Sequence, residues 1–168
     1  GDAVDWTYGS DGIIAYTPEV GSPSQGFWPS ENEVESLCEN QYKPNKVFAF
    51  CAGSDFILDG YSFSNELVSG STNDIMLNIK NRGLMPSSGS VNITITSLSQ
   101  LISIEDQTKE ISTLNSWEMS GVEFELVISN QVTYFSEASI KVLIHDSKSY
   151  HFIDTVNFFI GNRVSIFE

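Results

Sequence analysis

The chain is poor in cationic side chains. Its 168 residues include 8 Lys and Arg against 22 Asp and Glu, which gives a net charge of -14. A surface that neutralises phosphate groups needs clustered Lys and Arg, so this charge excludes nucleic-acid binding and argues against adhesion to anionic lipid. Residues 1–42 contain no Lys or Arg and carry eight carboxylates, which we interpret as a solubilising acidic face.

Cysteine is also scarce, and long apolar runs are missing. Cys38 and Cys51 are too few for a disulfide framework, and their spacing matches no zinc or redox motif. One continuous helix would separate them by about 20 Å, so buried free thiols are expected, whereas a helix broken at Pro44 leaves their pairing open. No run approaches the roughly 18 apolar residues of a membrane helix, so we expect no membrane span.

The first fifty residues predict turns, one short strand and a helix. Ile13–Thr17 is expected to be the strand. Ser30 is a good N-cap with Glu33 at the third helical position, so a helix should start there. Pro44 should kink or end this helix, and residues 47–52 are expected to form a second helical stretch.

From about residue 54 the apolar period changes from 3.6 to 2. Alternating apolar and polar residues occupy 75–79, 91–95, 122–128, 140–144 and 152–158, and weaker strands are expected near 56–58, 101–104 and 109–114. Seven or eight short strands in this length predict an antiparallel, immunoglobulin-like β-sandwich. Residues 78–83 and 90–95 also resemble the cell-adhesion-related sandwich modules of bacterial surface proteins.

Aromatic and histidine side chains in this region suggest no site of their own. Trp117, Tyr134 and Tyr150 could form a sugar-stacking platform, but we expect them to pack in the core. His145 lies at a turn and His151 on a strand. Neither belongs to a helical His-x-x-Glu pair, so we expect no metal-ligand role for them.

An ordered series of motifs opens the chain. Residues 1–9 read Gly-Asp-Ala-Val-Asp-Trp-Thr-Tyr-Gly, residues 14–21 read Ile-Ala-Tyr-Thr-Pro-Glu-Val-Gly, and residues 26–29 read Gly-Phe-Trp-Pro. In this order they resemble the closing stretch of a zinc metallocarboxypeptidase of the carboxypeptidase A/B family, over residues 1–52. The resemblance implies a fragment of a secreted hydrolase, a protease that removes C-terminal residues from peptides.

The same resemblance implies three site residues and a cofactor. Glu19 matches the carboxylate that transfers protons from a zinc-bound water to the leaving amine. Val4 and Thr17 match positions that line the pocket for the substrate's terminal side chain, and an apolar Val4 would favour aliphatic or aromatic residues. The family's zinc ligands lie upstream, so zinc is implied for the intact parent protein. We expect none in this chain, which is predicted to be inactive.

The overall expectation is a mainly β chain in two parts. Residues 1–52 are predicted to be a strand-plus-helix remnant of an α/β carboxypeptidase domain, and residues 54–168 a β-sandwich accessory domain. The alternative function is a stand-alone extracellular binding or adhesion module of immunoglobulin-like fold. Both functional hypotheses place the chain outside the cell or at its surface. Uncovered apolar faces also predict self-association through residues 1–52.

Overall fold

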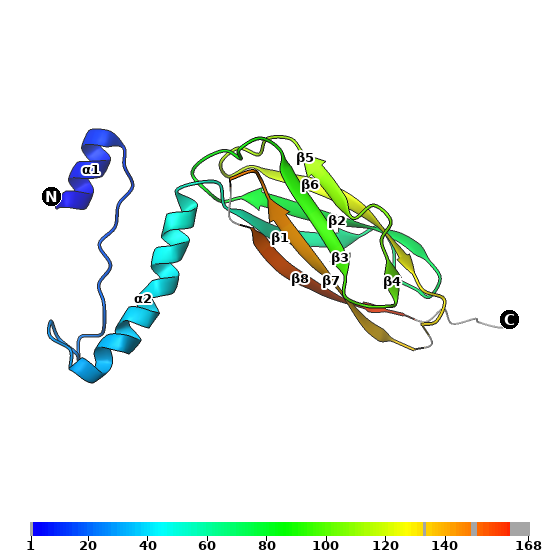
Figure 1. Cartoon of the computed structure of the whole chain (residues 1–168), viewed down its shortest axis with the longest axis horizontal. Coiled ribbons are helices and arrows are strands. Elements are labelled where there is room, and N and C mark those ends of the chain that lie inside the picture. Colours follow the sequence, from blue (N-terminus) through cyan, green and yellow to red (C-terminus); the bar gives the residue numbers. More distant parts are fainter. Residues whose placement is uncertain (1, 133, 149–150, 162–168) are drawn as a thin grey trace. The chain divides into compact units, whose positions relative to one another are not determined.

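A computed structural model describes residues 2–132, 134–148 and 151–161 of the chain. These residues form two helices and eight strands, which Figure 1 follows along the sequence. The chain divides into two compact units between Val47 and Phe48. Helix α1 (Ala3–Asp11) and most of helix α2 (Glu31–Cys51) belong to the first unit, and every described strand belongs to the second.

Helix α1 is closed at both ends by residues suited to those positions. Asp2 caps the start, where its Oδ1 accepts hydrogen bonds from the N–H groups of Val4 at 3.0 Å and Asp5 at 3.2 Å. Gly12 follows the helix with a φ of 66°, and its N–H donates to the Tyr8 carbonyl at 3.0 Å. This left-handed glycine is a common helix ending. The turns predicted for this stretch are therefore wrong over Ala3–Asp11, where the chain is helical.

The strand predicted at Ile13–Thr17 is absent. Residues 12–20 are irregular, and no described strand pairs with them. A strand is stabilised by backbone hydrogen bonds to a neighbour, which this segment does not have. The predicted strand-plus-helix remnant of an α/β domain is therefore wrong, although its helix exists.

Helix α2 begins as predicted. The Glu33 carboxylate accepts hydrogen bonds from the Ser30 N–H at 3.1 Å and the Ser30 hydroxyl at 2.7 Å, which is the back-reaching contact of a capping box. A hydrogen bond from Gln25 and those from Ser30 lower the pKa of Glu33. The start of the helix is thus tied to the preceding loop.

Helix α2 does not end at Pro44, and the separate helical stretch predicted at 47–52 is part of α2. Pro44 lies inside α2, which continues to Cys51. Proline removes one N–H donor, yet its fixed φ is close to the helical value, so a helix can pass through it. Cys38 and Cys51 lie on this one helix and are free thiols, but Cys38 is exposed and Cys51 half-buried, so the expectation that both are buried is wrong.

The second unit is a sandwich, and its mainly β, antiparallel architecture confirms the predicted class. Among the described residues, one sheet has the order β1-β2-β6-β4 and the other β5-β3-β7-β8. The strands are β1 (Phe56–Phe63), β2 (Thr72–Asn81), β3 (Val91–Ser97), β4 (Ile102–Ser103), β5 (Thr108–Ile111), β6 (Met119–Ile128), β7 (Ser136–His145) and β8 (Phe152–Ile160).

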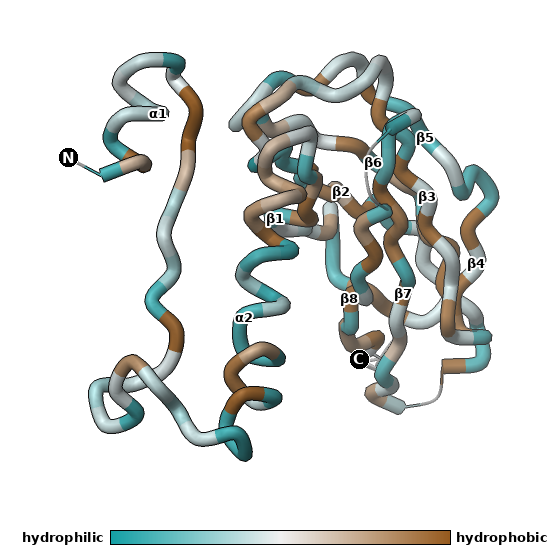
Figure 2. The backbone as a smooth tube through the Cα atoms, turned by 60° about the vertical axis from the view of Figure 1, so that its left-hand side comes forward, coloured by the Kyte–Doolittle hydropathy of each residue, from teal (hydrophilic) through white to brown (hydrophobic). Residues whose placement is uncertain are grey.

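The inward faces of the two sheets form one apolar core. Ile75 pairs with Phe124 and Leu77 pairs with Val122 across β2 and β6, and all four side chains are buried. Figure 2 shows apolar positions recurring along the strands of both sheets. Because the inward faces of the strands are committed to packing, the end loops and the outward faces of the sheets are the surfaces open to function.

Candidate binding surface at one end of the sandwich

The three site residues predicted from the sequence do not line one site. Val4 is half-buried on α1 and lines a hollow of about 340 Å³ with Asp5 and Tyr8. Glu19 is exposed in the irregular segment between the helices and lines a different hollow, of about 560 Å³. Thr17 is exposed and lines neither of them. In the part of the chain that the structure describes, no three or more His, Cys, Asp or Glu residues are grouped to hold a metal ion.

A buried amide organises one end of the sandwich. We call this region the Asn81 end and define it as the loops 52–55, 82–90, 112–118 and 146–148. Asn81, the last residue of β2, is 0% exposed. Its Oδ1 accepts from the N–H groups of Asp55 and Gly83, both at 3.0 Å. Its Nδ2 donates to the carbonyls of Met85 at 2.8 Å and Leu114 at 3.1 Å. These four bonds use the full capacity of the amide, so one side chain ties three loops together.

A buried carboxylate joins the fourth loop to the others. Asp146 follows β7 and is 3% exposed. Its Oδ2 accepts from the Ser54 hydroxyl at 3.0 Å and the Ser88 N–H at 2.6 Å, and its Oδ1 accepts from the Lys148 N–H at 2.8 Å. Burying a carboxylate is costly unless it is hydrogen-bonded, and these bonds meet that need. The loops are therefore held in one arrangement.

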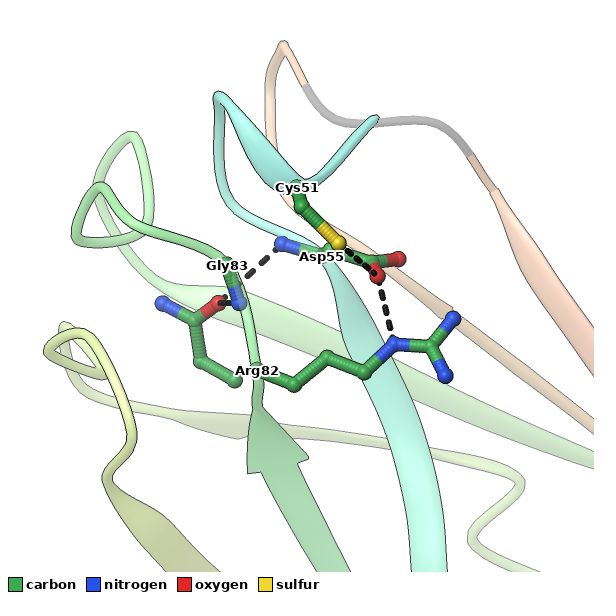
Figure 3. Close-up of polar contacts among 5 residues, drawn as sticks. Cys51, Asp55, Arg82 and Gly83 are labelled. Carbon is green, nitrogen blue, oxygen red and sulfur yellow. Dashed lines mark hydrogen bonds and ion pairs between the residues drawn. The ribbon is translucent and has the colours of Figure 1, made fainter. Parts of the chain in front are cut away.

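Figure 3 shows a third polar contact in this region, where Arg82 and Cys51 converge on Asp55. The Arg82 Nε lies 2.5 Å from the Asp55 Oδ2, and the Cys51 Sγ lies 3.8 Å from the same oxygen. Burial raises the pKa of the Cys51 thiol, the Asp55 charge raises it further, and Arg82 opposes this. A thiol that resists ionisation is a poor nucleophile, so Cys51 is structural.

A tight turn projects from the Asn81 end. The Glu118 N–H donates to the Asn115 carbonyl at 3.1 Å, which closes the β-turn Asn115–Glu118. The Glu118 carboxylate turns back and accepts from the Asn115 N–H at 2.7 Å and its Nδ2 at 2.8 Å. The turn is thus fixed by both backbone and side-chain bonds.

Trp117 occupies the third position of this turn with a φ of 62°, where glycine is preferred. A bulky residue in the left-handed region is an outlier. Its N–H donates to the Asn81 carbonyl at 2.7 Å, and the Lys80 Nζ lies 5.7 Å from its ring centroid. The indole is nevertheless 63% exposed. The expected core role of Trp117 is therefore wrong. Tyr134 is exposed as well, and Tyr150 lies outside the described residues.

Further apolar side chains are exposed at or beside the same end. Leu84 and Met85 lie in the 82–90 loop, and Met119 begins β6 directly after the turn. A hollow of about 440 Å³ lies next to Met85 and also contacts Ser88 and Lys148. The Asn81 end thus combines an ordered backbone with an exposed Trp, Leu and Met surface.

Comparison with known proteins finds similar solved structures but no matching family. No protein-family model and no curated protein sequence matches the chain. It is similar to the alpha-2-macroglobulin of Escherichia coli from domain MG7 to the C-terminus, with a TM-score of 0.48, 16% identity, and coverage of 67% of this chain and 17% of that one. It is also similar to a FixG-related protein from Vibrio parahaemolyticus (TM-score 0.40, 16% identity, 62% and 96% covered). A CARDB domain from Pyrococcus furiosus gives a TM-score of 0.41 at 10% identity, with 65% and 88% covered.

The resemblance of residues 1–52 to a zinc metallocarboxypeptidase is wrong. Neither family models nor curated sequences provide a match, and none of the three similar structures is a carboxypeptidase. The shared motifs are a few residues each, and the segment that carries Glu19 is irregular rather than a strand. The predictions of a hydrolase, of proteolysis and of zinc dependence that rested on this resemblance are not retained.

The sequence analysis missed both Asn81 and the backbone conformation of Trp117, although only one of them has a signal in the sequence. Asn81 continues the inward-facing positions of β2, two residues after Ile79, and a polar residue in that phase must find buried partners. That signal is readable in the sequence. The positive φ of Trp117 has no such signal, because turn contacts rather than its residue type impose it.

Proposed function

We propose that the chain is a non-catalytic binding module that holds a protein partner at the Asn81 end. The observation that carries this proposal is Trp117. An L-residue in the left-handed region costs about 1–2 kcal/mol, which a glycine would avoid. The indole stays largely exposed at that cost, and the Lys80 ammonium contacts its ring. Local strain of this kind clusters at ligand contacts, and Trp is enriched among the residues that dominate binding energy.

The surrounding chemistry supports a protein partner rather than a sugar. Trp and Met are enriched in protein interfaces, and Met adapts to partners of different shape. Met85 and Met119 are both exposed near the turn. A sugar site would set free carboxylates or amides beside the indole, whereas Glu118 is turned back onto Asn115 and Asn81 is buried.

The proposal includes a location outside the cell or at its surface. Sandwich domains of this architecture are common among cell-surface modules, with loops at their ends as contact sites. Fractionation of cells that express the native gene tests this part. Recovery of the chain with the soluble cytoplasmic proteins alone would contradict it.

The binding surface can be tested with selected peptides. Random displayed peptides are selected on the immobilised full chain, and their affinities are measured by fluorescence anisotropy. Trp117→Gly removes the indole and fits the backbone, and Tyr134→Ala, an exposed aromatic residue of the same unit outside the Asn81 end, is the matched control. Selected peptides should bind the wild type and Tyr134→Ala equally and bind Trp117→Gly at least about tenfold more weakly. Equal binding to Trp117→Gly, or no enriched peptide, would overturn the proposal.

We also propose that residues 1–52 mediate self-association. No residue from 2 to 47 is buried, and Phe27 and Trp28 are 97% and 93% exposed. Uncovered apolar surface of this kind favours association. The eight carboxylates of residues 1–42 oppose it, so added salt should strengthen it by screening their repulsion.

Sedimentation velocity of the full chain at low and high salt tests this association. Wild type should shift toward a dimer as salt rises, and a Phe27→Ser, Trp28→Ser double variant should remain monomeric. A monomeric wild type at every salt concentration would refute it.

A further inference from the structure

The chain has two histidines, and the fold brings them into contact. His145 ends β7, and His151 comes directly before β8. Their ring centroids are 4.6 Å apart with an angle of 42° between the ring planes. Ile144 pairs with Phe152 in the β7–β8 register, so the two histidines occupy the next position of the same ladder.

A hydrogen bond fixes the free nitrogen of His145. Its Nδ1 lies 3.1 Å from the Asp146 carbonyl oxygen. A carbonyl can only accept, so Nδ1 carries the proton and Nε2 keeps its lone pair. Histidines that bind metals commonly donate their other ring N–H to a carbonyl in this way, which sets the tautomer and the ring orientation.

The outward-facing sheet positions next to the pair are uncharged, and the carboxylate of Glu110 lies one strand further on, as the register partner of Asn92. Asn92 of β3 is the register neighbour of His145. Leu143 and Ile153 lie two residues away along β7 and β8, on the same face. Mg²⁺ and Ca²⁺ prefer oxygen ligands, and carboxylates above all. Imidazoles without carboxylates suit Zn²⁺, Ni²⁺ and Cu²⁺ instead.

The sequence predicts no metal-ligand role for either histidine, but the contact between their rings changes that expectation. We propose that His145 and His151 form a surface site for one divalent late transition-metal ion. His145 binds through Nε2, His151 supplies the second nitrogen, and water completes the coordination. No three-residue group of metal ligands exists among the described residues, so binding is weaker and more reversible than in a closed four-ligand site. The ion would bridge the ends of β7 and β8 and stabilise the folded state by mass action.

Zinc titration followed by NMR tests the site directly. Two histidines give two imidazole Cε1–Hε1 signals in the full chain, and both should shift together on adding Zn²⁺, with one ion per chain. His145→Ala and His151→Ala should each weaken binding at the remaining imidazole by at least about tenfold. Mg²⁺ should move neither signal.

A matched variant separates this site from general cation binding by an acidic protein. Ile153→Thr changes the same face of β8, two residues from His151, and should leave the zinc affinity unchanged. The proposal is overturned if neither signal responds to excess Zn²⁺. It is equally overturned if one histidine keeps its affinity when the other is replaced, because the two then bind independently.

Discussion

The strained turn at Trp117 predicts a reversed order of stability between two substitutions. Trp117→Gly and Trp117→Ala both remove the indole and its contact with Lys80. Both keep the N–H that donates to the Asn81 carbonyl. The difference between the two variants therefore reports the backbone alone. At ordinary positions alanine is more stable than glycine by roughly 0.5–1 kcal/mol, because glycine loses more conformational freedom on folding.

At position 117 the order should reverse. Alanine keeps the left-handed penalty of about 1–2 kcal/mol, whereas glycine avoids it and bears only its entropy cost. The balance makes Trp117→Gly more stable than Trp117→Ala by about 1 kcal/mol. Losing the Lys80 contact costs about 0.5–1 kcal/mol, which the strain relief offsets. Trp117→Gly should thus lie within about 1 kcal/mol of the wild type, which makes it a folded variant for binding assays.

Urea unfolding followed by far-UV circular dichroism measures these differences, provided that the variants share one m-value. Met119 gives the control pair. It is the exposed first residue of β6 and has no positive φ, so Met119→Ala should be more stable than Met119→Gly. If alanine is also the more stable residue at position 117, the left-handed backbone of Trp117 and the strain argument built on it are both refuted.

Three further predictions concern other parts of the chain. Asn81→Ala leaves four backbone groups without their partner and should lower the free energy of unfolding by about 2–4 kcal/mol. The control Asn78→Ala, on the outer face of the same strand, should lower it by about 0.5 kcal/mol or less. Comparable losses for the two variants would contradict the anchoring role of Asn81. Cys38 should be alkylated faster than Cys51, because the thiol of Cys51 has a raised pKa. Mass spectrometry after limited labelling measures the two alkylation rates, and equal rates would contradict the prediction. The pKa of Glu33 is lowered in the folded chain, so its support of the α2 start is present above the unfolded pKa and is lost as pH falls through the folded pKa. The NMR shift of the Ser30 N–H, which donates to this carboxylate, should follow that loss in the wild type and should change much less with pH in Glu33→Gln.

The sandwich can be predicted from the sequence because burial enforces its pattern. Ile75, Leu77 and Ile79 are all 0% exposed. Shifting the pairing register of β2 by one residue would turn these three side chains from the core to solvent. The first unit has no such constraint, since none of residues 2–47 is buried. Its short motifs could therefore suggest a strand at Ile13–Thr17 and a relationship to peptidases without any packing pattern to contradict them.

The same reasoning explains which residues of the proposed sites could be predicted from the sequence and which could not. Asn81 could be predicted, because a polar residue in the inward phase of a buried strand requires partners. The pairing of His145 with His151 needs the register across the β7–β8 turn, which two strand patterns in phase can supply. Trp117 could not be predicted, since its φ is imposed by the Asn81 carbonyl and by the Asn115–Glu118 turn. Its own preference is overruled there, and positions where local preference is overruled are where function is to be sought. The exposed indole therefore carries more information about binding than the well-ordered core that supports it.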